Sequence, residues 1–139
     1  MAKTCHLITG LGIGGAEIQL YHLVTRINHE LFSPVVVSML EPGPVGEMLS
    51  DAGITVYSLG MRKGVCGLFT HLRGAYRLYK IIQKEKPDIT ILYMYHAILL
   101  GRLIGKLAGM YCIIASFRVS PTNNFMEQIK NFALRFTSW

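Results

Sequence analysis

The chain has 139 residues, of which 51% are hydrophobic and only 16% are charged, so it can bury a core within one domain and is not intrinsically disordered. Fourteen Lys and Arg against eight Asp and Glu give a formal net charge of +6. That excess favours acidic ligands, phosphates or anionic lipid head groups, but an ordinary solvated surface carries the same charge. No apolar segment of the kind found in secretion signals follows the first residues.

Strand-like and helix-like segments alternate from the start of the chain. Residues 4–9 (TCHLIT) have the pattern of a buried strand, and apolar residues at helical spacing predict a helix over 16–28. The β-branched run at 34–40 predicts a second strand. A proline- and glycine-rich break then leads into a short helix over 45–52 and a third strand over 54–59.

The second half continues the alternation. A loop over 60–67 precedes a long predicted helix over 69–85. Pro87 ends that helix, and a strand is predicted at 88–94. A helix at about 97–108 and a fifth strand at 111–116 follow. The residues expected to face inward on the long helix are Leu72, Ala75, Tyr76, Tyr79 and Ile82.

This order of elements predicts the fold class. Strands that alternate with helices favour right-handed crossovers and a Rossmann-like α/β fold, in which helices cover both faces of a parallel sheet. A last amphipathic helix is predicted after Pro121, and the sequence stops at Trp139 inside its apolar pattern. We therefore expect residues 1–139 to form a single domain that is the front portion of a longer protein.

A glycine-rich turn joins the first strand to the first helix in LITGLGIGGAEIQLYHLV. Gly10, Gly12 and Gly15 spell G-x-G-x-x-G, and the free amides of such a turn suit a phosphate. A dinucleotide site also needs an acidic residue at the end of the second strand, for which Glu41 lies late and is followed by Pro42. An NAD(P)- or flavin-binding oxidoreductase domain is therefore one alternative, and a turn whose glycines only permit close packing is another.

Ligands of open α/β sheets bind beyond the carboxyl ends of the strands, where several polar residues are expected to meet. Arg118 can hold a phosphate or carboxylate by paired hydrogen bonds. His96 can donate to a sugar hydroxyl or phosphate, or accept a proton. The alternatives are that His96 is a helix N-cap or a half-buried histidine and that Arg118 pairs with Glu17. The candidate site residues are Gly14, Gly15, Glu17, Tyr95, His96, Ser116 and Arg118.

The histidines and cysteines show neither the spacing of a metal site nor a local nucleophile motif, so no metal is expected. Cys5, Cys66 and Cys112 form no paired motif, and their odd number is typical of a reducing compartment. Cys5 and Cys112 fall in apolar runs and are expected to pack as small hydrophobic side chains.

The long helix also carries a basic stripe. Arg73, Arg77, Lys80 and Lys84 follow one another at i, i+4, i+7 and i+11. A solvated helix face explains this pattern, and so does a surface that docks on an anionic membrane. Nucleic acid is not expected as a partner, because we expect no exposed aromatic residues between these cations and no nucleic-acid motif is present.

Four segments carry a resemblance to one family. GIGGAEIQLYHL is similar to the G-G-A-E turn and first helix of family 4 retaining glycosyltransferases, which have the GT-B fold. EPGPVGEMLSDAGITVYSLGM and KPDITILYMYHAILLGRLIGKLAG resemble their next segments, and IIASFRVS resembles the strand and loop that end near a cleft arginine or histidine. The resemblance covers nearly the whole chain in order, and departs from the family pattern at Tyr93 and Ile98.

The resemblance implies two Rossmann-like domains with a cleft between them. The N-terminal domain, which this chain matches, would bind mainly the acceptor, whereas a C-terminal domain with paired glutamates, absent here, would bind the nucleotide-sugar. Gly14 and Gly15 would then approach the donor diphosphate with Glu17 at the helix start, and His96 and Arg118 would line the cleft. No cofactor beyond the nucleotide-sugar is implied, and the fragment alone is expected to be inactive.

The resemblance also implies a setting in the cell. Many members act at the inner membrane face on lipid-linked sugars, so we expect a cytoplasmic or peripheral membrane protein of polysaccharide or cell-surface glycan synthesis with a saccharide or lipid-linked acceptor. The basic helix would then face the membrane. The remaining alternative is a non-enzymatic, truncated module that only binds a partner or a membrane.

Overall fold

The computed structural model describes residues 1–62 and 68–116 of the chain. Within these residues a parallel sheet is built from five strands in the order β3-β2-β1-β4-β5, with helices in the crossovers. The last helix, predicted after Pro121, lies outside the described residues. The elements in chain order are β1 (Ala2–Ile8), α1 (Gly15–Arg26), β2 (Phe32–Ser38), α2 (Pro44–Asp51), β3 (Thr55–Ser58), α3 (Leu68–Glu85), β4 (Ile89–Tyr93), α4 (Tyr95–Leu107) and β5 (Ile113–Ser116).

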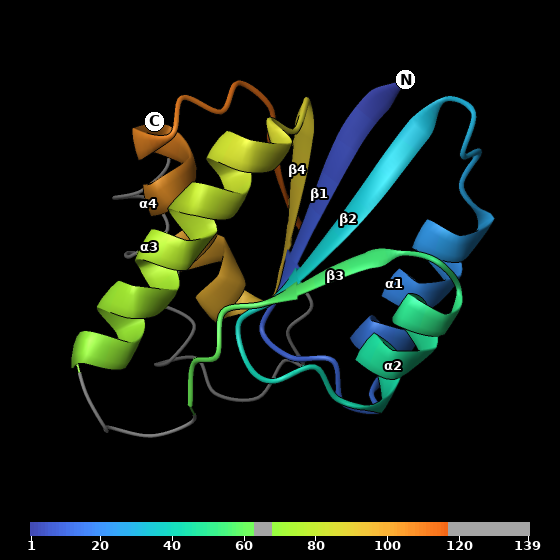
Figure 1. The fold of residues 1–139 in the computed structure, drawn as a ribbon, viewed down its shortest axis with the longest axis horizontal. Coiled ribbons are helices and arrows are strands. Elements are labelled where there is room, and N and C mark those ends of the chain that lie inside the picture. The colour runs from blue at the N-terminus through green and yellow to red at the C-terminus, as the bar shows by residue number, and fades with distance from the viewer. Residues whose placement is uncertain (63–67, 117–139) are drawn as a thin grey trace, which may run out of the picture.

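Helices cover both faces of the sheet, as predicted. Figure 1 shows α1 and α2 on one side and α3 and α4 on the other. Alternate residues of β1 supply the two cores, because successive side chains of a strand point to opposite faces. Leu7 packs with the cluster under α3 and α4, whereas Ile8 packs with the cluster under α1 and α2. Both side chains are fully buried.

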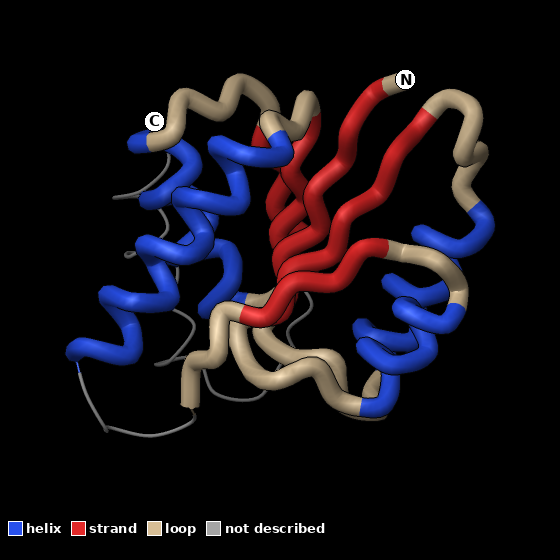
Figure 2. The backbone as a smooth tube through the Cα atoms, in the orientation of Figure 1, coloured by secondary structure: helices blue, strands red, loops and turns tan. Residues whose placement is uncertain are grey.

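The register brings the carboxyl ends of the strands to one edge. Ile8 of β1 pairs with Ser38 of β2 and with Tyr93 of β4, and the outer partners at this level are Ser58 and Ser116. The segments that leave Ile8, Ser38, Ser58 and Tyr93 therefore start side by side. In Figure 2 the loops after β1, β2 and β3 gather beyond the lower end of the sheet, which is where ligands bind in folds of this type.

Helix α3 is rotated relative to the prediction: Ile82 is buried and Ala75 packs against the core as expected, but the other three residues expected to face inward do not. The expectation that Leu72, Tyr76 and Tyr79 point inward is wrong, since they are 57%, 60% and 36% exposed. The helix packs instead through Gly74, whose missing Cβ leaves room for the side chain of Met61. The small residue decides the rotation of the helix, which an apolar pattern alone does not reveal. The buried residues of α3 are Gly74, Leu78 and Ile82.

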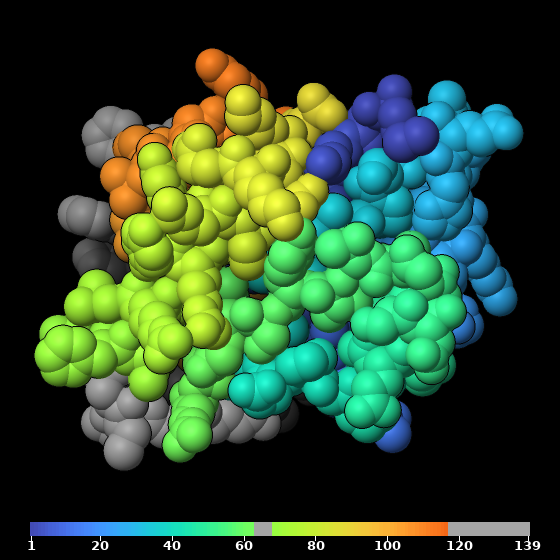
Figure 3. Space-filling model, viewed as in Figure 1, coloured from blue at the N-terminus to red at the C-terminus, as the bar shows by residue number. Residues whose placement is uncertain are grey.

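The end of α3 is tied to the sheet by an ionic cluster around Glu85. Its carboxylate accepts hydrogen bonds from Lys3 Nζ at 2.8 Å and from the Tyr57 hydroxyl at 2.6 Å. These two bonds hold the pKa of Glu85 below its usual value. Lys84 Nζ in turn donates to the Tyr57 hydroxyl at 3.1 Å. The surface in Figure 3 shows the yellow-green side chains of α3 beside the green ones of β3.

The cysteines divide between core and surface. Cys5 is buried in β1, as expected, and burial raises the pKa of its thiol to about 12, so it packs as a neutral group. The expectation for Cys112 is wrong, because this residue is exposed in the loop before the edge strand β5. Cys66 lies outside the described residues.

Candidate functional site

A cavity of about 610 Å³ opens at the carboxyl edge of the sheet, on the side covered by α3 and α4. Its walls come from the loop after β1, the segments that follow β2 and β3, and the first halves of α3 and α4. A volume of this size suits a small ligand or part of a larger one. The lining residues are Thr9, Met39, Leu40, Met61, Arg62, His71, His96, Leu99, Leu100 and Leu103.

The turn between β4 and α4 places His96 in this cavity. Met94, the N-cap of α4, has φ of 69° and ψ of 157°, a conformation that a residue with a side chain adopts only at a cost of about 1–3 kcal/mol. Strain of this kind concentrates at functional sites. His96 follows in the first turn of α4 and is exposed, and its ring meets the ring of Tyr95 edge-on at 5.5 Å. Both alternatives for His96, an N-cap and a half-buried histidine, are therefore wrong.

Thr9 also lines this cavity, at the start of the loop after β1. Its carbonyl oxygen accepts a hydrogen bond from the Leu40 amide at 3.1 Å, which fixes the loop after β1 against the segment after β2. The Thr9 hydroxyl itself is buried and has no hydrogen-bond partner within the described part of the chain. Buried polar groups in folded proteins are nearly always paired, so a ligand group is the natural partner for this one.

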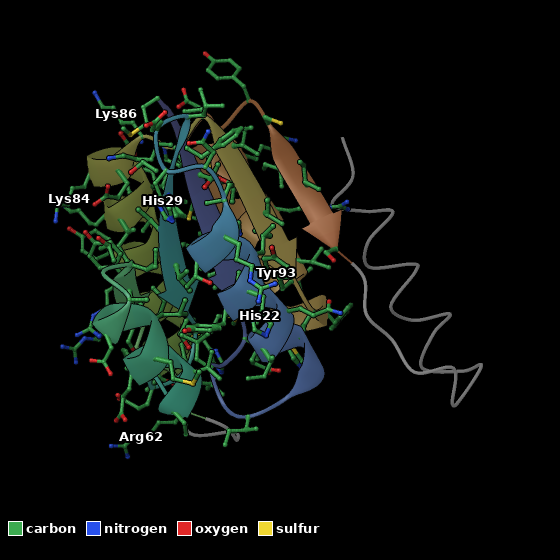
Figure 4. The ribbon with its side chains drawn as sticks, turned by 90° about the vertical axis from the view of Figure 1, so that its right-hand side faces the viewer. His22, His29, Arg62, Lys84, Lys86 and Tyr93 are labelled. Carbon is green, nitrogen blue, oxygen red and sulfur yellow. The ribbon has the colours of Figure 1, made fainter. Side chains whose placement is uncertain are left out.

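Arg62 and His71 are cavity residues that the sequence analysis did not identify. Arg62 follows β3, and His71 lies in the first half of α3. A helix that follows a parallel strand starts at the carboxyl edge, so their positions in the predicted elements were a usable signal. Figure 4 shows Arg62 at the lower end of the molecule, far from Lys84 and Lys86 at the upper end.

The glycine-rich turn lies on the α1 side of the edge and does not line the cavity. Gly14 is the extended N-cap of α1, and its carbonyl oxygen accepts the Ile18 amide at 3.0 Å. The Glu17 side chain folds back over Gly14, where any Cβ would collide with its carboxylate. Gly15 is exposed. A carboxylate at the helix start satisfies the helix dipole there and opposes a second anion at the same point.

The structure disfavours the dinucleotide interpretation of the turn. In that fingerprint the third glycine permits close packing of helix on strand. A Cβ added at Gly12 or Gly15 would meet no other atom within 4 Å, so neither glycine serves close packing. Glu41 is exposed beyond the end of β2, which closes at Ser38, and is therefore poorly placed for a ribose.

The remaining candidates are less closely grouped. Tyr95 packs against the core under α3 and α4, and Ser116 is half-buried at the end of β5, next to Tyr93 of β4. Neither residue lines the cavity. Arg118 lies outside the described residues, so its pairing with Glu17 or with a ligand stays a prediction.

Replacing Gly43 by alanine is expected to lower the free energy of unfolding by about 1–3 kcal/mol and to displace the loop after β1. Gly43 lies against the loop after β1, where its Cβ would come within 2.6 Å of the Leu11 carbonyl oxygen. Backbone must move to relieve this contact. Urea denaturation of the variant measures the change.

The matched control is Gly12→Ala, in the same loop region but with nothing within 4 Å of the added Cβ. Both substitutions restrict the unfolded chain equally, so their difference isolates the collision at Leu11. Equal stabilities of the two variants would contradict the close approach of the two loops.

The four cations of the basic stripe are all exposed on α3, and two of them also bond to β3 or to the residue that follows it. Arg77 donates to the Leu59 carbonyl oxygen at 3.3 Å, and Lys84 bonds the Tyr57 hydroxyl. The premise that exposed aromatics are missing is wrong, because Tyr76 and Tyr79 are exposed and Lys80 lies 5.6 Å from the Tyr76 ring centre. The stripe residues are Arg73, Arg77, Lys80 and Lys84.

Among residues 1–62 and 68–116, no three His, Cys, Asp or Glu side chains gather in a way that could bind a metal ion. The expectation of a metal-free site stays a prediction. In the same part of the chain, every helix is too short or too polar to cross a membrane.

A family model described as "Glycosyl transferase 4-like" matches residues 13–138 of the sequence. Among curated proteins, none matches the sequence. The match covers every residue that lines the cavity except Thr9.

Solved structures share the fold at low sequence identity. MurG of Acinetobacter baumannii is 16% identical with a TM-score of 0.69, over 99% of this chain and 40% of that one. HepE of Anabaena in complex with UDP and glucose is 16% identical with a TM-score of 0.69, over 99% and 34%. UDP-GlcNAc 2-epimerase of Neisseria meningitidis bound to UDP-GlcNAc is 14% identical with a TM-score of 0.66, over 98% and 39%. The chain thus spans well under half the length of each.

Proposed function

The chain belongs to the glycosyl transferase 4-like family, and we propose that it forms the acceptor-side domain of a retaining glycosyltransferase. The donor would be a nucleotide-sugar held mainly by a second domain, and the acceptor a saccharide or lipid-linked saccharide. The chain matches 34–40% of the length of the three solved structures described above, which supports a second domain in the active protein.

The observation that carries this proposal is the cavity at the carboxyl edge, which His96 and Thr9 both line. His96 can donate to a sugar or phosphate oxygen, and Thr9 can both donate and accept. The first turn of α4 adds the positive end of a helix dipole beside His96. This set of groups suits a hydroxyl-rich, anionic reaction partner.

In the proposed reaction, the bond between the anomeric carbon and the distal phosphate oxygen breaks, and its electron pair leaves on the nucleoside diphosphate. An acceptor hydroxyl oxygen bonds to the same face of that carbon, and its proton passes to the departing phosphate. His96 would stabilise the charge that develops on the leaving group, which is the kind of electrostatic contribution that dominates many enzymes. Arg118 would act with it, as its motif implies.

The residues on the α1 side would serve the donor. Gly14 and Gly15 would offer backbone amides at the start of α1 to the donor diphosphate, and the Glu17 carboxylate, which lies over Gly14, would have to turn away for the diphosphate to bind. Tyr95 and Ser116 flank the same edge and would contact the sugars. HepE, which shares the fold, binds UDP and glucose. We propose a donor of the same class, a nucleotide-sugar, for this chain.

We place the protein in the cytoplasm at the inner membrane face, in the synthesis of polysaccharide or cell-surface glycan. Helix α3 supports a membrane position, because it carries the basic stripe and also exposes Leu68, Phe69 and Leu72. Cations and apolar side chains together are the features that bind anionic bilayers.

The chain alone is expected to show negligible sugar transfer, because most contacts to the donor lie in the second domain. Transfer of labelled sugar from nucleotide-sugars to extracted membrane lipids, measured by chromatography, tests this with and without that domain. Robust transfer by residues 1–139 alone would refute the proposal that a second domain binds the donor.

In the same assay, acceptor in anionic vesicles should react faster than acceptor in neutral vesicles. Equal rates would remove the support for the membrane position.

A further inference from the structure

Three hydrogen-bonded polar side chains lie in the core beneath α1, on the face of the sheet opposite the cavity. The two ring nitrogens of His6 lie 3.2 Å from the Tyr93 hydroxyl and 3.2 Å from the Thr4 hydroxyl. Tyr93 belongs to the core cluster under α1 and α2, whose other buried members are all Ile, Leu or Val. A phenylalanine would fill the same space and need no partner. The buried hydrogen bonds therefore contribute a fixed geometry more than they contribute stability.

The Tyr93 side chain anchors the end of β4. Tyr93 is the last residue of that strand, and its backbone is level with Ile8 of β1, whereas its hydroxyl reaches back to His6, two residues earlier in β1. The two rings are stacked, with their centres 6.0 Å apart and their planes inclined by 20°. Diagonal pairs of this kind join neighbouring strands through their side chains. In Figure 4, Tyr93 lies close to α1.

The residue that follows this anchor is the strained one. Met94 has φ of 69° and ψ of 157°, a region that essentially only glycine occupies and that persists only where the surrounding structure enforces it. Its side chain packs against the same cluster as Tyr93, and its carbonyl oxygen accepts the Ile98 amide at 3.0 Å. Tyr95 packs against the other core, under α3 and α4. The chain thus crosses from one core to the other within three residues, and His96 comes next.

We propose that Tyr93 is a positioning residue for His96. Its hydroxyl, held by His6, fixes the end of β4 so that Met94 keeps its strained conformation and His96 lies in the cavity. Without that anchor Met94 relaxes toward an ordinary conformation, and the first turn of α4 moves with it. The inference rests on the proposed function for the role of His96. It goes beyond that function because neither Tyr93 nor His6 lines the cavity.

Tyr93→Phe and Thr4→Val are matched variants. Each removes one hydroxyl group that bonds to the buried His6 ring, so both should lower the urea midpoint by similar amounts. Thr4 is level with Ile89, the first residue of β4, at the end of the strand away from His96. The assay is steady-state sugar transfer by the protein complete with its donor-binding domain.

Tyr93→Phe should lower kcat about tenfold or more and leave KM within about twofold, because a displaced His96 stabilises only the transition state less well. Thr4→Val should leave both constants within about twofold of wild type. Equal kcat values for the two variants would overturn the inference, since a general loss of core stability would then explain both.

A double-mutant cycle with Met94→Gly tests whether Tyr93 acts through the strained residue. Glycine adopts the conformation of Met94 without strain, so nothing remains for the Tyr93 anchor to enforce. In the Met94→Gly background, Tyr93→Phe should therefore change kcat by no more than about twofold. The same tenfold loss in both backgrounds would show that Tyr93 does not act through Met94.

The His96 ring gives a readout that does not require sugar transfer. In protein with ¹³C-labelled histidine, the ring signal of His96 is identified by its loss in His96→Ala. Tyr93→Phe should shift or broaden this signal, and Thr4→Val should leave it in place. The signal of His29, which is exposed after α1, should move in neither variant. An unmoved His96 signal in Tyr93→Phe would overturn the positioning role.

These readouts separate the inference from the proposed function. A His96 signal that moves only in Tyr93→Phe, in a protein whose wild type transfers no sugar, would support the positioning role and refute the transferase. Sugar transfer by wild type, with equal kcat values for Tyr93→Phe and Thr4→Val, would leave the transferase and refute the positioning role.

Discussion

Replacing His96 by alanine should lower kcat for sugar transfer by about a hundredfold or more. The imidazole lies in the first turn of α4, at the rim of the cavity, where charge develops on the departing diphosphate in the proposed reaction. Loss of one such charge-stabilising or proton-transferring group costs about 10²–10³ in rate, which corresponds to about 2.7–4 kcal/mol. Because His96 is exposed, its removal should leave the fold intact.

The measurement is steady-state transfer by the protein complete with its donor-binding domain. His22→Ala is the control, because His22 is also exposed, on α1, away from the cavity. The urea midpoint of each variant shows whether the fold is retained. A His96 variant with kcat close to that of the His22 variant would remove His96 from the reaction.

Acidification from pH 6.5 to pH 4 should cost the fold about 3 kcal/mol through His6 alone. This side chain is 1% exposed beneath α1, and burial lowers its pKa to about 4 from an ordinary 6.5. One ring nitrogen lies 3.2 Å from the Tyr93 hydroxyl and the other 3.2 Å from the Thr4 hydroxyl, so the neutral ring is already satisfied.

The sign follows from which state binds the proton. Between pH 6.5 and 4 the unfolded chain binds a proton at His6 and the folded chain does not, so stability is complete above pH 6.5 and falls as the pH drops. Glu85, whose pKa is lowered, also contributes stability that is lost on acidification, so the wild-type profile alone is insufficient.

Urea unfolding of His6→Gln, compared with wild type across this range, isolates the histidine. The variant should be less stable than wild type at pH 7 and should lose about 3 kcal/mol less on going to pH 4. His29→Gln is the control at an exposed position and should follow the wild-type profile. Parallel profiles for wild type and His6→Gln would show that His6 does not titrate with a lowered pKa.

The sheet could be predicted from the sequence because the strands are short apolar or β-branched runs, separated from the helices by turns rich in glycine and proline. The ends of two helices could be predicted from the glycines that follow them. Gly53 and Gly109 have φ of 81° and 73°, which other residues rarely adopt. Strand and helix bounds differ from the predicted ones by one or two residues. The edge that carries the site follows from the parallel order alone.

What the sequence did not reveal is how side chains pair across elements. The rotation of α3 depends on Met61 packing over Gly74. The spacing of apolar residues along the helix cannot predict this contact, because Met61 lies outside the helix. The same rotation brings His71 to the cavity. The buried position of the Thr9 hydroxyl is likewise visible only once the neighbouring loops are in place. The position of His96 at the cavity could be predicted, because the residue comes shortly after β4 at the edge where ligands bind.

The position of a bound acceptor in a crystal structure of the catalytically competent protein tests the central claim most directly. The account predicts acceptor density in the cavity beside Thr9 and His96. Acceptor density only on the α1 side of the sheet or at the amino edge, with the cavity left to solvent, would contradict it.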